Sequence, residues 1–309
     1  MFLGLDVGGT HCRCEWFPAG TVPGCEAPGV QPAVHGLEAA IAGLAEAIAL
    51  ATRTTSPTAV VAALAGVGES RTADAIAAGL RARGVAVPVA VTGDVLAAAA
   101  AGLAAGPGVL IWSGTGSFAV ARSRHGELHR TGGRGYLLGD QGSGYDLVRR
   151  AAAAVLLAID DLGPATVLTE TLTAAFRAPS PSRLGATLQQ LDTAGVAQQL
   201  PVVLAAAADG DVVANDVLAA GVDGLAMLAA GALRRADLDG RDVPVAMGGG
   251  VLLAAPAIRE LLSARLRSLG AAAPTVLDAR AAGRGAAWLA HGWHTHLEPQ
   301  HTWVTRVAL

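Results

Sequence analysis

The sequence predicts an α/β protein with two lobes that share one ligand cleft. The chain has 309 residues, whereas a typical domain has about 100–150. Strand patterns alternate with helical patterns in both halves, which is typical of α/β folds. A strand, a glycine-rich turn and a second strand follow one another twice, around Asp6 and around Ser113.

The first lobe is expected to span residues 1–108 and to hold a mixed sheet. Residues 2–7 form an apolar stretch of strand length that ends at a glycine pair, and residues 11–17 can pair back on it. Apolar periodicity and β-branched runs predict the other elements. They are strands at 21–26, 58–64 and 85–91, and helices at 36–51, 72–83 and 95–105.

The second lobe is expected to span residues 109–285. Its predicted strands are 109–113, 118–122, 127–130, 243–247 and 275–277. Helices are expected to dominate residues 145–235 and to recur at 258–269 and 283–296. Residues 286–309 are expected to form a C-terminal helix and tail, with packing on the first lobe as one arrangement.

Composition excludes several functions. All 22 basic residues are Arg, and the chain has no Lys. A P-loop lysine, the strand lysine of protein kinases and a Schiff-base lysine are therefore excluded. The formal net charge of −3 gives no electrostatic basis for binding nucleic acid.

The expected location is the cytoplasm, with no membrane association. The first six residues lack the basic start of a secretory signal. The longest uncharged stretch, 95–121, could cross a bilayer by length, but glycine-rich turns break it into a helix, a turn and a strand. The three cysteines lie within the first 25 residues and are expected to be reduced thiols rather than a disulfide framework.

Three glycine turns carry the main functional signal. They follow apolar strands at residues 6–10, 113–117 and 248–250. Glycine lets the backbone approach a ligand closely, and its N–H groups can hold phosphate oxygens. One such turn is weak evidence, but three of them in both halves favour a nucleotide between two lobes. Without Lys, phosphate charge must be met by backbone N–H groups, hydroxyls, Arg and a metal ion.

Two aspartates stand at predicted strand ends. Asp6 either caps the turn that follows it or holds hydrated Mg²⁺, which binds proteins through one or two carboxylates. Asp94 precedes an Ala-rich helix. It is therefore a candidate helix N-cap and a candidate general base, and the two roles are compatible.

Residues 132–144, GGRGYLLGDQGSG, form the most distinctive stretch. Six of its thirteen residues are Gly, and Asp140, Gln141 and Ser143 lie between them. A flexible linker is one interpretation. A ligand loop fits better, because the stretch embeds Tyr-Leu-Leu and leads directly into a helix.

Together these motifs resemble the N-acetylglucosamine kinase family of BadF/BadG/BcrA/BcrD-type ATPases, within the actin/Hsp70/hexokinase-like superfamily. The resemblance runs from Leu3 to about Ala290. It rests on DVGGT at 6–10, Gly93-Asp94, SGTGS at 113–117, GDQGSG at 139–144, GGG at 248–250 and Gly285-Ala286. It implies two RNase H-like lobes that close over MgATP and a sugar, and a homodimer as the expected assembly.

The resemblance also implies roles for individual residues. Asp94 would be the base for the sugar 6-hydroxyl, Asp140 would bind sugar hydroxyls, and Asp6 would lie near Mg²⁺. The implied ATP-binding residues are Gly8, Gly9, Thr10, Gly114, Thr115, Gly116, Ser117, Gly248, Gly249 and Gly250. The implied sugar-binding residues are Gln31, Asp94, Gly133, Arg134, Asp140, Gln141 and Ser143.

Three residues depart from the family pattern. Gln141 replaces the usual Glu, and Gln31 replaces the usual Asn. Each new side chain is similar in shape to the usual one or longer by one methylene, which indicates retuned sugar recognition. Arg134 replaces the usual Trp and so exchanges an apolar plane for a cation. It either accommodates an acidic sugar, such as one with a lactyl ether, or points into solvent.

The sequence therefore predicts an ATP-dependent kinase for the 6-hydroxyl of an amino sugar, with N-acetylglucosamine as the first candidate. A kinase for glucosamine or N-acetylmuramic acid and a non-catalytic sugar or nucleotide sensor on the same fold are the alternatives. An activator ATPase is disfavoured, because it bridges an iron–sulfur cluster with cysteines of the second lobe and no Cys follows Cys25. The histidines near the C-terminus either form a solvated helix end or bind a metal; they are His291, His294, His296 and His301.

Overall fold

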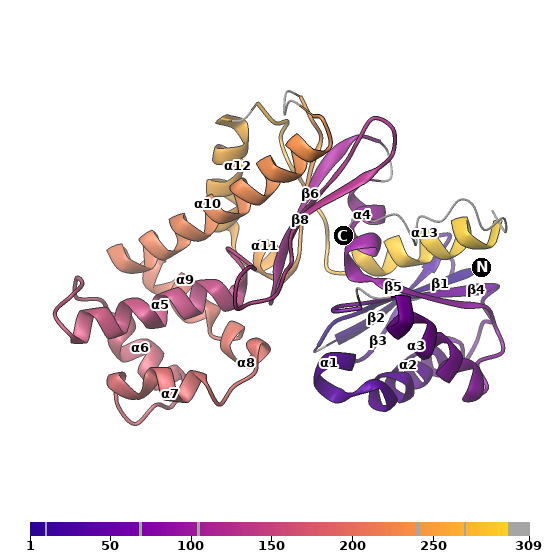
Figure 1. Cartoon of the computed structure of the whole chain (residues 1–309), viewed down its shortest axis with the longest axis horizontal. Coiled ribbons are helices and arrows are strands. Elements are labelled where there is room, and N and C mark those ends of the chain that lie inside the picture. The colour runs from indigo at the N-terminus through magenta and orange to yellow at the C-terminus, as the bar shows by residue number, and fades with distance from the viewer. Residues whose placement is uncertain (10, 68–69, 104–105, 239–241, 269, 296–309) are drawn as a thin grey trace. The chain divides into compact units, whose positions relative to one another are not determined.

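The structure is a computed structural model that describes the chain except for residues 10, 68–69, 104–105, 239–241, 269 and 296–309 (Figure 1). The chain divides into two compact units. Unit 1 contains Met1–Gly106 and the C-terminal segment that begins at Leu277, and unit 2 contains Pro107–Val276. Sequence analysis placed the ends of the first and second lobes at residues 108 and 285, whereas the units of the structure divide after Gly106 and after Val276. Each unit has a five-stranded sheet and helices, so the predicted α/β class is confirmed.

The sheet of unit 1 is mixed and has the order β3-β2-β1-β4-β5. β1 pairs antiparallel with β2 and parallel with β4, and β5 lies parallel to β4. All residues of β4 are buried, as expected for an apolar interior strand of a sheet with helices on both faces. The strands are β1 (Phe2–Val7), β2 (His11–Phe17), β3 (Cys25–Pro28), β4 (Ala59–Leu64) and β5 (Val89–Gly93).

Helices cover both faces of this sheet (Figure 1). The helices α1 (Pro32–His35), α2 (Leu37–Ala51) and α3 (Ser70–Ala82) lie on one face, and α4 (Asp94–Leu103) and α13 (Ala281–Thr295) lie on the other. Helix α13 packs closely against β1 and α4 at two glycines. A Cβ on Gly4 of β1 would overlap the backbone of Ala287, and a Cβ on Gly285 would overlap the backbone of Ala97 in α4.

Unit 2 repeats the strand pattern of unit 1. Its sheet has the order β10-β9-β6-β7-β8. The central strand β6 pairs antiparallel with β7 and parallel with β9, β8 continues antiparallel beside β7, and β10 continues parallel beside β9. Order and directions therefore match those of unit 1 strand for strand. The strands are β6 (Gly108–Ser113), β7 (Ser117–Arg122), β8 (Leu128–Gly132), β9 (Val245–Gly248) and β10 (Thr275–Val276).

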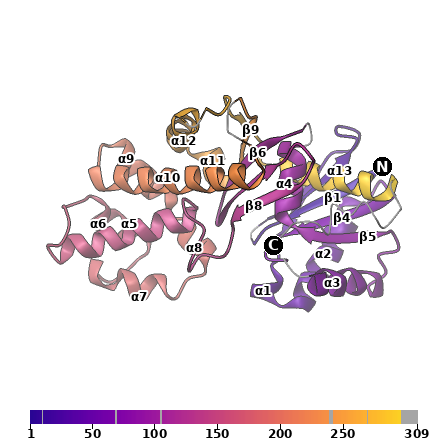
Figure 2. The same ribbon diagram turned by 45° about the horizontal axis from the view of Figure 1, so that its top comes forward.

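The other elements of unit 2 are helical, and α5 and α10 lie side by side in its core (Figures 1 and 2). By length and composition α10 could cross a membrane, but 56% of its most apolar window is buried inside the structure. The helices are α5 (Gly144–Ile159), α6 (Leu168–Ala175), the 3₁₀ turn η1 (Pro181–Arg183), α7 (Leu184–Leu188), α8 (Thr193–Ala197), α9 (Leu200–Ala208), α10 (Val212–Arg235), α11 (Gly250–Ala254) and α12 (Pro256–Ser268).

Two strands of unit 1 begin later than the sequence predicts. β3 begins at Cys25, because Pro23 interrupts the expected strand and offers no N–H to a ladder. β5 begins at Val89. The residues before β5 terminate helix α3. Gly84 has φ +88°, and Val85 N–H donates a hydrogen bond to the Leu80 carbonyl.

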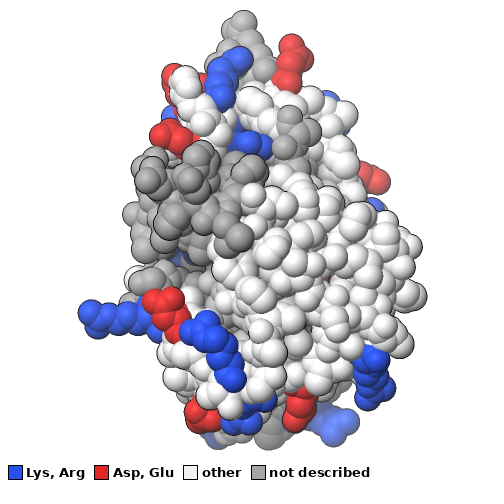
Figure 3. Space-filling model, turned by 90° about the vertical axis from the view of Figure 1, so that its right-hand side faces the viewer, with Lys and Arg blue, Asp and Glu red and all other residues white. Residues whose placement is uncertain are grey.

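Charged side chains are sparse, as their 15% share of the sequence predicts. On the face drawn in Figure 3, basic and acidic side chains lie above and below a broad area without charge. Each unit also has its own hydrophobic core, built between its sheet and its helices.

Candidate functional site

The parallel strands of unit 1 bring two carboxylates to one edge of the sheet. The register aligns Asp6 of β1 with Ala63 of β4, and Ala63 with Thr92 of β5. Asp94 follows the last residue of β5 directly. Ligands of open α/β sheets bind at the carboxyl ends of the parallel strands. Asp6 and Asp94 therefore lie where a ligand of this unit is expected.

Asp6 ionises at an unusually high pH. Its pKa is raised to about 6, first by burial and then by the Asp94 carboxylate, while Arg13 on β2 lowers it. Ionised Asp6 thus lacks much of the solvation that a carboxylate has in water, and the charge of Arg13 does not offset this loss and the repulsion from Asp94. A hydrated Mg²⁺ would supply both, since it binds oxygen ligands through one or two carboxylates. The residues present fit a magnesium ion.

Asp94 is the first residue of α4. One of its carboxylate oxygens accepts a hydrogen bond from Val95 N–H at 2.9 Å. The side chain is half-buried. It is therefore held at the start of the helix and still reaches the surface, as a proton acceptor for a bound hydroxyl must.

The turn between β1 and β2 lies beside Gln31. Gly8 N–H donates to the His11 carbonyl at 2.9 Å, which closes the turn. Gly9 is exposed, and a Cβ there would lie 3.4 Å from Gln31 Nε2. The predicted sugar residue Gln31 therefore lies next to the predicted phosphate turn. The remaining predicted residue of this turn, Thr10, lies outside the described residues.

In unit 2 the glycine-rich segments meet at one end of the sheet. Gly114 N–H donates to the Gly116 carbonyl at 2.9 Å, and Gly144 N–H donates to the Gly114 carbonyl at 2.8 Å. Gly249 has φ +94°, and a Cβ there would overlap the backbone of Ser113. The predicted ATP residues 114–117 and 248–250 are thus close together, with Thr115 and Gly250 exposed.

Asp140 lies against the β6–β7 turn. A Cβ on Gly116 would lie 3.0 Å from its Oδ2. Asp140 is buried and has φ +58°, a conformation that is strained for a residue other than glycine. Burial raises its pKa, although a hydrogen bond from Ser117 N–H and the charge of Arg130 oppose this. Strain, burial and a raised pKa in one carboxylate are typical of functional sites.

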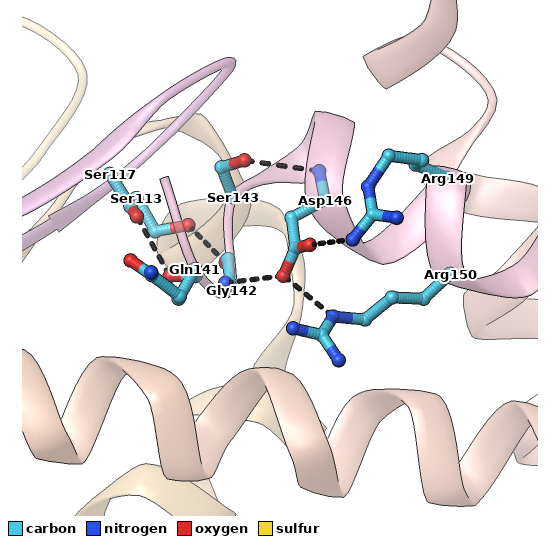
Figure 4. A network of polar contacts seen from close by, with 8 residues as sticks. All are labelled: Ser113, Ser117, Gln141, Gly142, Ser143, Asp146, Arg149 and Arg150. Carbon is cyan, nitrogen blue, oxygen red and sulfur yellow. Dashed lines mark hydrogen bonds and ion pairs between the residues drawn. The ribbon is translucent and has the colours of Figure 1, made fainter. Parts of the chain in front are cut away.

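Two hydroxyls fasten the Asp140 loop to the β6–β7 hairpin (Figure 4). Ser117 donates to the Gln141 carbonyl at 2.7 Å, and Ser113 donates to the Gly142 carbonyl at 2.8 Å. Ser143 is buried and caps α5, since its Oγ accepts from Asp146 N–H at 3.1 Å. The hydroxyls of Ser117 and Ser143 therefore serve contacts within unit 2, and their predicted ligand contacts stay predictions.

The start of the glycine-rich stretch is more exposed. The Gly133 carbonyl accepts a hydrogen bond from Arg130. Arg134 is exposed, and its Cβ lies 3.5 Å from the position that a Cβ on Gly139 would take. In the part of the chain that the structure describes, no carboxylate forms an ion pair with Arg134. Its guanidinium is therefore available to an anionic ligand.

Sequence analysis did not single out Asp146 or Trp112. Asp146 stands three residues after the N-cap Ser143, and this Ser-x-x-Asp spacing is a capping-box pattern that could have identified it. Trp112 packs against Gly248, where a Cβ would lie 2.5 Å from the indole ring. Only the pairing of β6 with β9 reveals that contact.

The other candidate metal ligands that the structure describes do not form a cluster. Among the described residues, no group of three or more His, Cys, Asp or Glu could hold a metal ion. His291 instead packs against Phe2 and Phe17, with ring centroids 5.0 and 4.8 Å apart, and His294 packs against Phe2 at 5.7 Å. His296 and His301 lie outside the described residues.

The sequence matches the model of the BadF/BadG/BcrA/BcrD ATPase family over residues 3–290. The chain belongs to this family. The family resemblance of its motifs is therefore confirmed. Most of the described motif residues of this BadF-type ATPase lie in two groups, one at the carboxyl-end edge of the unit 1 sheet and one around the β6–β7 turn of unit 2. Gly285 and Ala286 lie apart from both groups, in α13.

Two curated relatives match parts of the chain. An N-acetylmuramic acid/N-acetylglucosamine kinase of Clostridium acetobutylicum is 37% identical over 89 residues, which is 29% of each protein. An N-acetyl-D-glucosamine kinase of Dictyostelium discoideum is 31% identical over 163 residues, which is 52% of this chain and 51% of the relative. The matched segments thus span about a third and about half of these relatives.

A solved structure shares the fold over almost the whole chain. It belongs to a candidate N-acetylglucosamine kinase of Chromobacterium violaceum and is 23% identical. It has a TM-score of 0.74 and covers 93% of this chain and 97% of its own. The two-lobed α/β fold expected for a BadF-type ATPase is therefore confirmed.

Proposed function

We propose that this BadF-type ATPase is a sugar kinase that transfers the γ-phosphoryl group of ATP to the 6-hydroxyl of N-acetylglucosamine. The observation that carries the proposal is the pair of carboxylates, Asp6 and Asp94, at the carboxyl-end edge of the unit 1 sheet. Phosphoryl transfer to an alcohol needs a group that accepts the hydroxyl proton and a group that holds the metal of the nucleotide. The names of the two curated relatives support the substrate class.

In this proposal each carboxylate has its own task. Asp94 orients the acceptor hydroxyl and takes its proton, because it is half-buried and held at the start of α4. Asp6 holds Mg²⁺, which neutralises phosphate charge when bound. In unit 2, N–H groups of the β6–β7 turn and of residues 248–250 bind ATP, and Asp140 binds sugar hydroxyls. A cytoplasmic location and a homodimer belong to the same proposal.

N-acetylmuramic acid is the second candidate acceptor. The exposed guanidinium of Arg134 favours it, since the lactyl ether of this sugar carries a carboxylate. The Clostridium relative is named for both sugars, which supports the same choice.

The test is ADP release with MgATP and a panel of acceptors. The panel contains N-acetylglucosamine, N-acetylmuramic acid, glucosamine, N-acetylmannosamine, glucose and a sample without sugar. We expect turnover with N-acetylglucosamine and a product that carries phosphate on O6 by NMR. A chain that binds nucleotide but hydrolyses none of it in response to any sugar would be a sensor and not a kinase.

A further inference from the structure

Asp146 is a buried acidic residue whose contacts lead into the Asp140 loop. It is 4% exposed and occupies the third position of α5. Its Oδ2 accepts a hydrogen bond from Gly142 N–H at 3.0 Å and contacts Arg150 Nε at 2.8 Å, while Oδ1 contacts Arg149 Nη2 at 2.8 Å (Figure 4).

This arrangement differs from an ordinary capping box. There, the acidic side chain returns to the N–H of the N-cap residue. Here the N-cap N–H of Ser143 donates to the Asp140 carbonyl at 3.1 Å, and Asp146 reaches one residue further, to Gly142. The carboxylate therefore supports the loop before the helix as well as the helix itself.

The supported backbone has little room to move. Gly142 has φ +73°, and a Cβ there would overlap the backbone of Gly221 in α10. A Cβ on Gly224, one turn later, would lie 2.7 Å from the Gln141 Cβ. The loop is thus pressed against two glycines of α10, and its two carbonyls are held by Ser113 and Ser117. Without Asp146, the buried Gly142 N–H would lose its acceptor.

We propose that Asp146 is a positioning residue for the sugar site. Through Gly142 N–H it fixes the backbone of residues 139–144, so that Asp140 keeps its strained conformation and faces Ser117 and the β6–β7 turn. Arg149 and Arg150 hold the Asp146 carboxylate in place from the solvent side. The inference rests on the proposed function, because it assigns sugar binding to Asp140.

The test compares Asp146→Ala and Asp146→Asn with Asp223→Ala. Asp223 forms an exposed ion pair with Arg265 at 2.7 Å in the same unit, so it is a matched control for the loss of an acidic partner of Arg. Hydrogen exchange of the amides in residues 139–146, measured without ligands, reports the loop directly. Steady-state kinetics with N-acetylglucosamine and MgATP report the consequence.

We expect loop amides of Asp146→Ala to exchange at least about tenfold faster than those of the wild type. Its KM for N-acetylglucosamine is expected to rise about tenfold or more while the KM for MgATP changes little, because a small displacement of a positioned group can cost up to about 10²-fold. Asp146→Asn keeps an oxygen for Gly142 N–H and should recover part of both effects. Asp223→Ala should behave as wild type.

A folded Asp146→Ala with wild-type loop exchange would overturn the proposal. So would faster exchange spread evenly along α5, or a fall in kcat with both KM values unchanged, since those results describe a helix cap alone. If Asp146→Ala fails to fold, the same comparisons are made with Asp146→Asn. If the wild type phosphorylates no sugar, the proposed function fails, and the exchange measurement still decides whether Asp146 fixes the loop.

Discussion

Asp94 raises the pKa of Asp6, although strand β4 lies between the strands that lead to them. The two carboxylates converge because β1, β4 and β5 are parallel and end at the same edge of the sheet. Two like charges at a partly buried edge favour the uptake of a proton or a cation. This relationship predicts how pH and magnesium act on the protein.

Asp6→Asn is expected to stabilise unit 1 at pH 7.5 and not at pH 4. The pKa of Asp6 is about 6 in the folded protein, compared with its ordinary value of 3.8. Between these pH values the folded state therefore binds a proton that the unfolded state has lost. The stabilisation that Asp6 contributes is therefore complete below about pH 3.8 and is lost as the pH rises through 6. The loss is at most about 3 kcal/mol.

The measurement is urea unfolding of the wild type and Asp6→Asn at constant ionic strength across this pH range. Groups far from Asp6 contribute equally in the two proteins, so the difference reports Asp6 together with its interaction with Asp94. Magnesium with ADP should stabilise the wild type at pH 7.5 and stabilise Asp6→Asn much less. A stability difference that does not change with pH would contradict the assigned ionisation of Asp6.

Asp94→Asn is expected to fold and to lose about 10²–10⁴-fold in kcat, which is the usual contribution of a general base. The side-chain oxygen of the asparagine can still accept the hydrogen bond that Val95 N–H now donates to Asp94. Affinity for MgADP should change little. Asp74→Asn, an exposed position on α3, is the matched control. Full activity in a folded Asp94→Asn would remove Asp94 from the mechanism.

Much of the strand framework could be predicted from the sequence. Apolar runs next to glycine turns located β1, β2, β6 and β7 within one residue of their observed ends, because local pattern and turn chemistry agree there. The predicted starts of β3 and β5 were wrong where a proline and a helix end overrode apolar content.

The contacts within the site depend on tertiary structure. The sequence pointed to Asp140 and Ser117 separately, but their hydrogen bond exists only because the loop folds back on the β6–β7 hairpin. Asp146 carried a local capping signal, yet its reach to Gly142 depends on the positive φ of that glycine. The close approach of Gly4 to Ala287 joins residues far apart in the chain and has no local signature.

Gly285→Ala and Gly292→Ala are expected to have opposite effects on stability. Both residues lie in α13, but a Cβ on Gly285 would overlap the backbone of Ala97, whereas a Cβ on Gly292 meets nothing within 4 Å. Gly285→Ala should destabilise unit 1 by about 1–3 kcal/mol or more, because backbone cannot yield as a side chain can. Gly292→Ala should stabilise it by about 0.5–1 kcal/mol through helix propensity.

Chemical unfolding of both variants, with the wild type as reference, measures these effects. Since the two substitutions are chemically identical and lie on one helix, a common effect on helix propensity cancels between them. Equal stabilities of the two variants would mean that α13 does not approach α4 as closely as described.

Arg134→Ala is expected to lower kcat/KM for N-acetylmuramic acid relative to N-acetylglucosamine by up to about fivefold. An exposed ion pair is worth about 0.2–1 kcal/mol, and only the muramic sugar offers a carboxylate to the Arg134 guanidinium. The effect should shrink as salt is raised, because exposed charges are screened. Arg124→Ala, an exposed arginine between β7 and β8, is the control. An unchanged ratio would mean that the guanidinium of Arg134 points into solvent when sugar is bound.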